Sequence, residues 1–262
     1  MRISRVNESF LSGFERPALG WMAPRVPASI TPDHLTIIGL SGAVAAAAGY
    51  ILSRWSIEWL WLSVAGLIVN WAGDSLDGNV ARARGIERPR YGFFIDHTTD
   101  LFSQALVFLA LAASPCTRFS VAATGLIAFL MGFVYTLIYF KATDTMRITY
   151  FRFGPTEIRA LLVVGNLITL WAGVLDLGQY FPALGRFGAV TIYEVFIVLI
   201  CLIAIPAFAL LAIRESRLLA RDDPPRVTQG QLVAASQSAA VPEYQPGGAP
   251  APAYQAPVIN AG

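Results

Sequence analysis

Apolar residues gather in six long runs, and the shorter segments between them hold most of the charged residues. The runs cover residues 36–53, 57–73, 93–113, 119–140, 158–175 and 190–213. A helix that crosses a bilayer needs about 20 predominantly apolar residues, and each run reaches or approaches that length. The pattern therefore predicts an all-α, polytopic membrane protein with six transmembrane helices.

The composition supports a membrane protein over a soluble one. Of the 262 residues, 55% are hydrophobic and only 14% are charged. This is too apolar for a soluble globule of ordinary composition. The net charge is +2 and the basic residues are spread along the chain, so nucleic acid is not an expected partner. Membrane lipids are the expected surroundings.

Lysine and arginine fall almost entirely in alternate segments. Sixteen of the nineteen lie in the N-terminal segment, the second and fourth loops and the C-terminal end, while the other three loops hold one each. Because positively charged loops stay in the cytoplasm, both termini are predicted to be cytoplasmic. We expect a bacterial inner membrane, on the sole ground that no eukaryotic targeting signal is seen.

Two segments flank the region of the six runs, 31–215. Residues 1–30 are expected to be a juxtamembrane segment, either an interfacial helix that ends near Pro17 or an irregular arm. Residues 222–262 are rich in Pro, Ala and Gln and lack a long apolar run. They cannot bury a core and are predicted to form a disordered cytoplasmic tail.

Four aspartates stand where the second and third runs approach the loop between them. Asp74 and Asp77 are three residues apart, and Asp96 and Asp100 are four apart, so each pair lies on one helix face. Carboxylates this close to an apolar region are costly and repel one another, which calls for a cation between them. Carboxylate ligands favour a hard divalent ion such as Mg²⁺ or Mn²⁺, and two such ions suit phosphoryl transfer.

The neighbours of these aspartates suit a substrate that contains phosphate. Gly78 and Ala81 share the helix face of Asp74 and leave it without bulk, so a nucleotide can approach closely. Arg82 follows at once, and a guanidinium can hold phosphate oxygens through two parallel hydrogen bonds.

The stretch resembles the signature of the CDP-alcohol phosphatidyltransferase family, DxxDGxxAR followed by a spacer and GxxxDxxxD. All eight fixed positions are present, as Asp74, Asp77, Gly78, Ala81, Arg82, Gly92, Asp96 and Asp100. The spacer has nine residues, where eight is the commonest form. Residues 31–36 also resemble the TPNxLT sequence that precedes the first helix in the family, with Asp33 in place of Asn.

The resemblance implies that 31–215 is a CDP-alcohol phosphotransferase domain, usually dimeric, that works in phospholipid synthesis. Such an enzyme moves a substituted phosphate group, here expected to be phosphatidyl, from a CDP-linked donor to an alcohol and releases CMP. The four aspartates would bind two Mg²⁺ or Mn²⁺ ions at the cytoplasmic face, and Asp100 would also act as the base. The implied contacts to the donor come from Asp74, Gly78, Ala81, Arg82 and Gly92.

Two further residues are candidates for the chemistry. With His97, residues 96–100 resemble the DHxxD sequence of the choline and ethanolamine phosphotransferase branch. His97 either accepts the proton of the acceptor hydroxyl or only orients a neighbouring residue. Glu157, at the start of the fifth run, either contacts the acceptor, pairs with His97, or offsets the helix dipole. Arg88, Arg90, Arg147 and Arg152 either line an anionic acceptor site or follow the positive-inside rule.

Several alternatives stay open at this point. A CDP-diacylglycerol donor would be used with a small polar alcohol, whereas CDP-ethanolamine or CDP-choline would be used with diacylglycerol. Outside this enzyme class, a cation transporter and an inactive membrane scaffold are the alternatives, because intramembrane acids also mark ion pathways.

Overall fold

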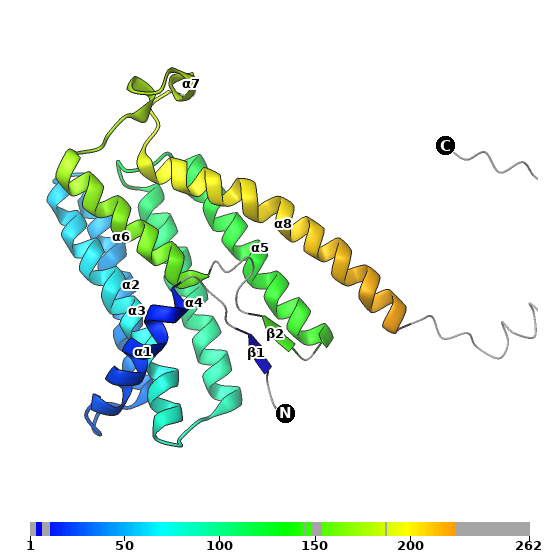
Figure 1. Ribbon diagram of the computed structural model, residues 1–262. Helices are drawn as coiled ribbons and strands as arrows, with labels where there is room; N and C mark the ends of the chain where they lie inside the picture. The colour runs from blue at the N-terminus through cyan, green and yellow to red at the C-terminus, as the bar shows by residue number, and fades with distance from the viewer. Residues whose placement is uncertain (1–3, 7–10, 144, 148–153, 187, 224–262) are drawn as a thin grey trace, which may run out of the picture. The chain divides into compact units, whose positions relative to one another are not determined.

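The computed structural model describes residues 4–6, 11–143, 145–147, 154–186 and 188–223, and this part of the chain is almost entirely helical (Figure 1). A long helix lies at each of the six predicted runs. They are α2 (Pro32–Leu52), α3 (Leu60–Ala83), α4 (Pro89–Ala112), α5 (Phe119–Thr143), α6 (Pro155–Ala172) and α8 (Ile192–Asp222). The predicted all-α class is confirmed for the described residues.

The remaining elements are short. They are the helices α1 (Ser12–Met22) and α7 (Pro182–Gly185), the 3-10 turns η1 (Ala23–Arg25), η2 (Ile57–Trp59) and η3 (Leu177–Gln179), and the strands β1 (Ser4–Val6) and β2 (Thr145–Arg147). The two strands pair in parallel, so the segment before α1 lies beside the one that follows α5. They were not predicted, because three residues are too few to show a strand's alternating pattern.

Three of the long helices are candidate membrane spans within the described residues. By length and composition, α2, α5 and α8 are apolar enough to cross a bilayer. The helices α3 and α4 are as long, but they carry the aspartates and other polar residues in their halves near the α3–α4 loop. The chain is thus an integral membrane protein with long apolar helices, and the prediction of six spans stays a prediction.

Close contact between backbones fixes α3 against α2. A Cβ atom on Gly66 of α3 would lie only 2.4 Å from the backbone nitrogen of Ala46, and one on Gly73 would lie 2.4 Å from that of Gly39. Small residues allow this approach, and the buried Asn70 adds a hydrogen bond of 2.9 Å from its Nδ2 to the Gly39 carbonyl. The helix that carries the first two aspartates is therefore held firmly in place.

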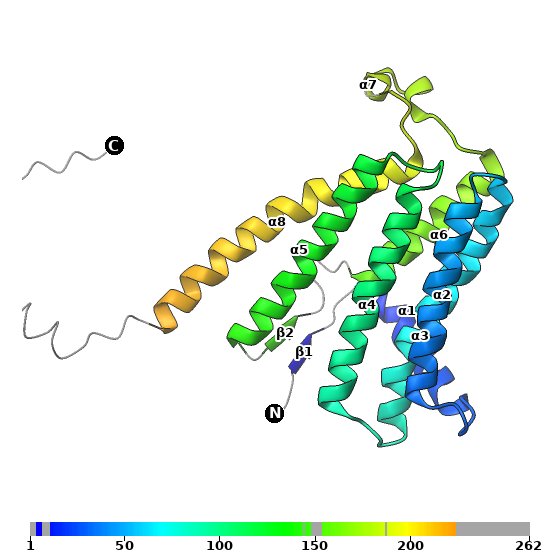
Figure 2. The ribbon, with the colours of Figure 1, turned by 180° about the vertical axis from the view of Figure 1, so that it is seen from behind.

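The segment before α2 forms a helix that continues through Pro17 to Met22, so the predicted end near Pro17 is wrong. Pro17 costs one helical hydrogen bond, and tertiary contacts of α1 offset that loss. Leu19 is buried with Leu76 and Val80 of α3. In both views α1 lies at the end of the helices where α3 turns into α4, whereas α7 lies at the opposite end (Figures 1 and 2).

Contacts divide the chain into two units, Met1–Leu211 and Ala212–Gly262. The first contains α1 to α7 and most of α8, and it holds the whole candidate site. The second begins within α8. Its residues beyond Asp223, which make up nearly all of the predicted tail, lie outside the described residues.

Candidate active site

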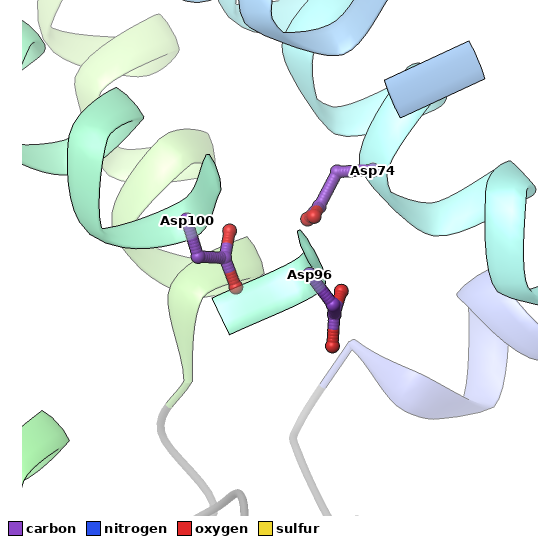
Figure 3. A group of neighbouring side chains, drawn as sticks. All are labelled: Asp74, Asp96 and Asp100. Atoms are coloured by element: carbon purple, nitrogen blue, oxygen red, sulfur yellow. The ribbon is translucent and has the colours of Figure 1, made fainter. Parts of the chain in front are cut away.

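Three aspartates meet where α3 and α4 face each other. Asp74 of α3 and Asp96 and Asp100 of α4 each offer a carboxylate oxygen, and these oxygens all lie within 4.8 Å of one another. Figure 3 shows the three side chains as neighbours. All three are partly buried. Carboxylate oxygens at this spacing are the ligands that hard divalent cations prefer, so the residues fit Mg²⁺ or Mn²⁺.

Asp77 does not belong to this group of carboxylates. The hydroxyl of Thr36 in α2 donates a hydrogen bond of 2.6 Å to Asp77 Oδ2, and the backbone N–H of Gly78 donates to Oδ1. The sequence placed four carboxylates in one space. The structure brings three of them together and directs the fourth toward α2.

A buried cation that the sequence analysis did not assign to the site bridges two of the aspartates. Arg159 of α6 donates from Nη1 to Asp74 Oδ2 at 2.8 Å and from Nη2 to Asp100 Oδ1 at 3.1 Å. Only 4% of its side chain is exposed, and its Nε has no hydrogen-bond partner among the described residues. Its position inside the fifth apolar run was the available signal, because an ionisable residue there needs a partner.

His97 lies beside the aspartates and is packed between aromatic rings. It stacks on Phe93 with 4.2 Å between ring centroids, and Phe133 lies 5.9 Å away on another helix. Its Nδ1 is 2.9 Å from the Phe93 carbonyl oxygen and 3.5 Å from Asp96 Oδ2. The carbonyl contact favours a proton on Nδ1, which leaves Nε2 as the nitrogen able to accept one.

Glu157 is buried at the start of α6, and both of its carboxylate oxygens accept hydrogen bonds from backbone N–H groups. Oε2 accepts from Gly154 at 2.9 Å, which caps the helix, and Oε1 accepts from Leu11 at 3.0 Å. These bonds join the segment at α1 to the start of α6. The predicted contact of Glu157 with an acceptor stays a prediction.

Glu15 of α1 is a second residue whose role the sequence analysis missed. Its Oε1 accepts hydrogen bonds from Trp71 Nε1 at 2.9 Å, Ser75 Oγ at 3.1 Å and Thr156 Oγ1 at 3.3 Å. Trp71 and Ser75 belong to α3 and Thr156 to α6. One carboxylate on α1 therefore ties together the two helices that carry Asp74 and Arg159.

The residues expected to contact a donor lie around the same end of α3 and α4. The Arg82 guanidinium lies over Gly78, where an added Cβ would be 3.3 Å from Arg82 Nη1. Ala81 is partly buried on the next turn of the same helix. A Cβ on Gly92 would meet no atom within 4 Å, so space is open there. The arrangement leaves a guanidinium and open space near the carboxylates.

The four arginines that were candidates for an anionic acceptor site differ in their contacts and in whether the structure describes them. Arg88 forms an exposed ion pair with Asp33, with Nη2 2.5 Å and 2.7 Å from the two carboxylate oxygens. The hydrogen bond from this guanidinium to Asp33 raises the pKa of Arg88 above its usual value. Arg90 is exposed, nothing is described of the Arg147 side chain, and Arg152 lies outside the described residues.

A cavity of about 390 Å³ opens beside Asp100 and His97. It is bounded by residues of α4, α5, α6 and α8, and most of its lining is aromatic or aliphatic. Typical lining residues are Phe129, Phe133, Leu161, Phe196, Ile200 and Phe208. The candidate site thus combines a carboxylate cluster with an apolar space next to it.

Comparison with known proteins places most of the chain in one family. Residues 29–206, more than half of the chain, match the profile of a family described as CDP-alcohol phosphatidyltransferase. The matched range contains α2 to α6, the carboxylate cluster, Arg159 and the lining of the cavity up to Ala204.

Individual relatives match shorter stretches. The chain is 38% identical over 85 residues to phosphatidylinositol phosphate synthase of Cutibacterium acnes, which covers 32% of this chain and 39% of the relative. It is 30% identical over 140 residues to archaetidylinositol phosphate synthase of Methanothermobacter thermautotrophicus, with 52% and 66% covered. Cholinephosphotransferase 1 of Danio rerio is 28% identical over 177 residues, with 63% and 44% covered. In each case the chain spans less than two thirds of the relative's length.

Proposed function

The chain belongs to the CDP-alcohol phosphatidyltransferase family, and from this premise we propose that it transfers a substituted phosphate group from a CDP-linked donor to an alcohol, releasing CMP. The observation that carries the proposal is the convergence of Asp74, Asp96 and Asp100 in one space. The reaction belongs to phospholipid synthesis. The names of the relatives refer to different products, so both phosphatidyl transfer and aminoalcohol phosphate transfer are compatible with them.

The carboxylates are proposed to hold two Mg²⁺ or Mn²⁺ ions, with Asp77 joining the other three. When bound, these ions neutralise the donor pyrophosphate and the charge that develops as CMP departs. Arg82 would contact phosphate oxygens beside Gly78, and the open space at Gly92 would admit the nucleotide.

The proposed reaction is an attack by the acceptor hydroxyl on phosphorus. The hydroxyl oxygen forms a bond to the phosphorus that carries the transferred group, while the bond from that phosphorus to the bridging oxygen breaks and CMP leaves with that oxygen. Asp100 takes the hydroxyl proton. Arg159 donates to its Oδ1, so we assign the proton to Oδ2, with His97 as the alternative base.

We further propose six membrane spans, with both termini and the site on the cytoplasmic side of a bacterial inner membrane, and a homodimeric assembly. The loop between α3 and α4 supports this orientation because it carries four arginines on or beside it and lies at the same end as α1. Residues 1–30, 31–215 and 222–262 are proposed as juxtamembrane segment, catalytic domain and tail.

The test is CMP release by the purified protein in detergent with Mn²⁺. Asp100→Asn keeps the size of the side chain and removes the base, so release should stop in protein that still shows a cooperative unfolding transition. Asp222→Asn, an exposed change at the end of α8, is the matched control. CMP release by Asp100→Asn at the wild-type rate would show that the carboxylate cluster does not perform the reaction and would favour a scaffold.

A further inference from the structure

Two acceptors lie within reach of the one proton on the Thr36 hydroxyl. Thr36 Oγ1 is 2.6 Å from Asp77 Oδ2 on α3 and 3.2 Å from the carbonyl oxygen of Pro32, one turn earlier in α2. A hydroxyl donates one hydrogen bond at a time, so the shorter contact with the carboxylate takes the proton. When Asp77 turns away, the same hydroxyl can donate to the Pro32 carbonyl, as threonines inside helices commonly do. Thr36 therefore loses little when it releases Asp77.

The first turn of α2 is fixed by its own contacts, which makes Thr36 a stationary donor. Thr31 Oγ1 accepts a hydrogen bond from the backbone N–H of His34 at 3.2 Å, and His34 Nδ1 accepts one from the backbone N–H of Thr31 at 3.3 Å. Asp33, in the same turn, forms its ion pair with the loop between α3 and α4. A change at the contact therefore takes place through the side chain of Asp77.

Asp77 lies outside the group of three carboxylates, although it is three residues from Asp74 on the same helix. Both of its oxygens accept hydrogen bonds, Oδ2 from Thr36 and Oδ1 from the backbone N–H of Gly78. To join the group, the carboxylate must turn toward Asp74, which breaks the bond to Thr36. A hydrogen bond to an ionised group shifts an equilibrium by about tenfold, so Thr36 opposes that turn.

The charges decide when the turn becomes favourable. The three carboxylates, when ionised, and the Arg159 guanidinium carry a net charge of minus two, which one divalent ion balances. A second ion brings further positive charge, and this attracts a fourth carboxylate. The pyrophosphate of a CDP-linked donor is the other source of negative charge for such an ion. Asp77 is therefore drawn to the group when the second ion and the donor bind together.

We propose that Thr36 is a positioning residue that keeps Asp77 out of the carboxylate group until a second divalent cation binds together with the donor. The inference rests on the proposed function and adds the order in which the site is completed. Without donor, Asp77 stays on Thr36 and the site holds one ion. With donor, Asp77 turns to the group and the Thr36 hydroxyl donates to the Pro32 carbonyl instead.

The first experiment counts Mn²⁺ ions on the purified full-length protein in detergent, from the electron paramagnetic resonance signal of free Mn²⁺. Titrations are made with and without CDP, the part that all the candidate donors share, and the Mn²⁺ bound by CDP alone is subtracted. The wild type should bind one ion tightly without CDP and two with it. A wild-type protein that binds two ions equally tightly without CDP would overturn the proposal.

Substitutions at Thr36 then test its hydroxyl. Thr36→Val removes the hydroxyl at nearly constant size, so without CDP the second Mn²⁺ should bind about tenfold more tightly than in the wild type. Thr36→Ser keeps the hydroxyl and should behave as the wild type. Thr124→Val is the matched control, because the Thr124 hydroxyl donates to the Ser120 carbonyl at an exposed position of α5. A second-ion affinity in Thr36→Val equal to or below the wild-type value would overturn the role of Thr36.

Asp77→Asn tests the other partner of the contact and serves if Thr36→Val does not fold. It should bind the first Mn²⁺ as the wild type does and fail to bind the second with CDP, whereas loss of the first ion would overturn the order of binding. CMP release separates this inference from the proposed function. If Mn²⁺ binds as expected and none of the proteins releases CMP with any donor and acceptor, the proposed transfer is wrong and the role of Thr36 stands.

Discussion

The bridge formed by Arg159 predicts a specific response of protein stability to metal. Without metal, this guanidinium is the cation that contacts both Asp74 and Asp100. Arg159→Met keeps an apolar side chain of similar length and removes the charge. The carboxylates then face one another with less compensation, so the metal-free protein should lose stability, and a divalent cation that supplies the missing charge should restore much of it.

The size of the effect follows from the burial of the three side chains. Removing one partner of a buried ion pair costs about 3–5 kcal/mol, because the other partner keeps its charge in a poorly solvated place. Asp74 and Asp100 retain 20% and 22% exposure, and the unpartnered Nε of Arg159 is itself unfavourable. Both facts favour the lower end, about 3 kcal/mol. For a unit of this size that is a fall in melting temperature of roughly 6–12 °C.

The assay is thermal unfolding followed by intrinsic fluorescence, in EDTA and in excess Mn²⁺. A ligand that binds only the folded state raises its stability more when it binds more tightly. The rise in melting temperature from EDTA to Mn²⁺ should therefore be larger for Arg159→Met than for the wild type. Arg118→Met is the control, since Arg118 forms its ion pair with the buried Glu194, which belongs to neither the carboxylate cluster nor the cavity lining.

The control separates loss of an ion pair from an effect on the metal site. Arg118→Met should melt at a lower temperature in both buffers and gain from Mn²⁺ as much as the wild type does. Two results would refute the reasoning for Arg159. One is a melting temperature in EDTA equal to that of the wild type, and the other is a gain from Mn²⁺ no larger than the wild-type gain.

Three other regions give predictions of their own. Gly66→Ala should lower the melting temperature by an amount equivalent to about 1–3 kcal/mol, because its methyl group would meet the Ala46 backbone, while Gly20→Ala, with no atom within 4 Å of the added carbon, should not lower it. Glu15→Ala leaves three donors without their acceptor and should expose α1 to trypsin sooner, with Glu15→Gln closer to the wild type; equal cleavage rates in all three proteins would contradict this. Ending the chain after Asp223 should leave CMP release near normal, and a large loss in folded protein would show that the tail takes part.

The helices and the carboxylate positions could be predicted because their signals are local. A run of about 20 apolar residues marks a long helix wherever it later packs. Spacings of three and four residues place side chains on one helix face, and this placed Asp96 next to Asp100 correctly. The extent of α1 was not predictable in this way, because Pro17 argues locally for an end and contacts with α3 decide otherwise.

The partners of the aspartates could not be predicted, because they depend on how distant segments pack. Arg159 is 85 residues from Asp74 and 59 from Asp100, and Glu15 is 56 residues from Trp71. No period in the sequence connects such positions. The location of Asp77 shows the same limit, since its spacing from Asp74 suggested a shared space, and only the packing of α2 reveals Thr36 as its partner.

The charges of the described site explain why the separation of Asp77 matters. Asp74, Asp96 and Asp100, when all are ionised, carry three negative charges, and Arg159 contributes one positive charge among them. One divalent cation would balance the net charge of minus two that remains. A second cation at this site would need further negative charge, which Asp77 and a donor pyrophosphate together would provide. Thr36 donates to Asp77 Oδ2, and Asp77 is not among the three grouped carboxylates, so we expect one divalent ion to bind without the donor and a second to bind together with it.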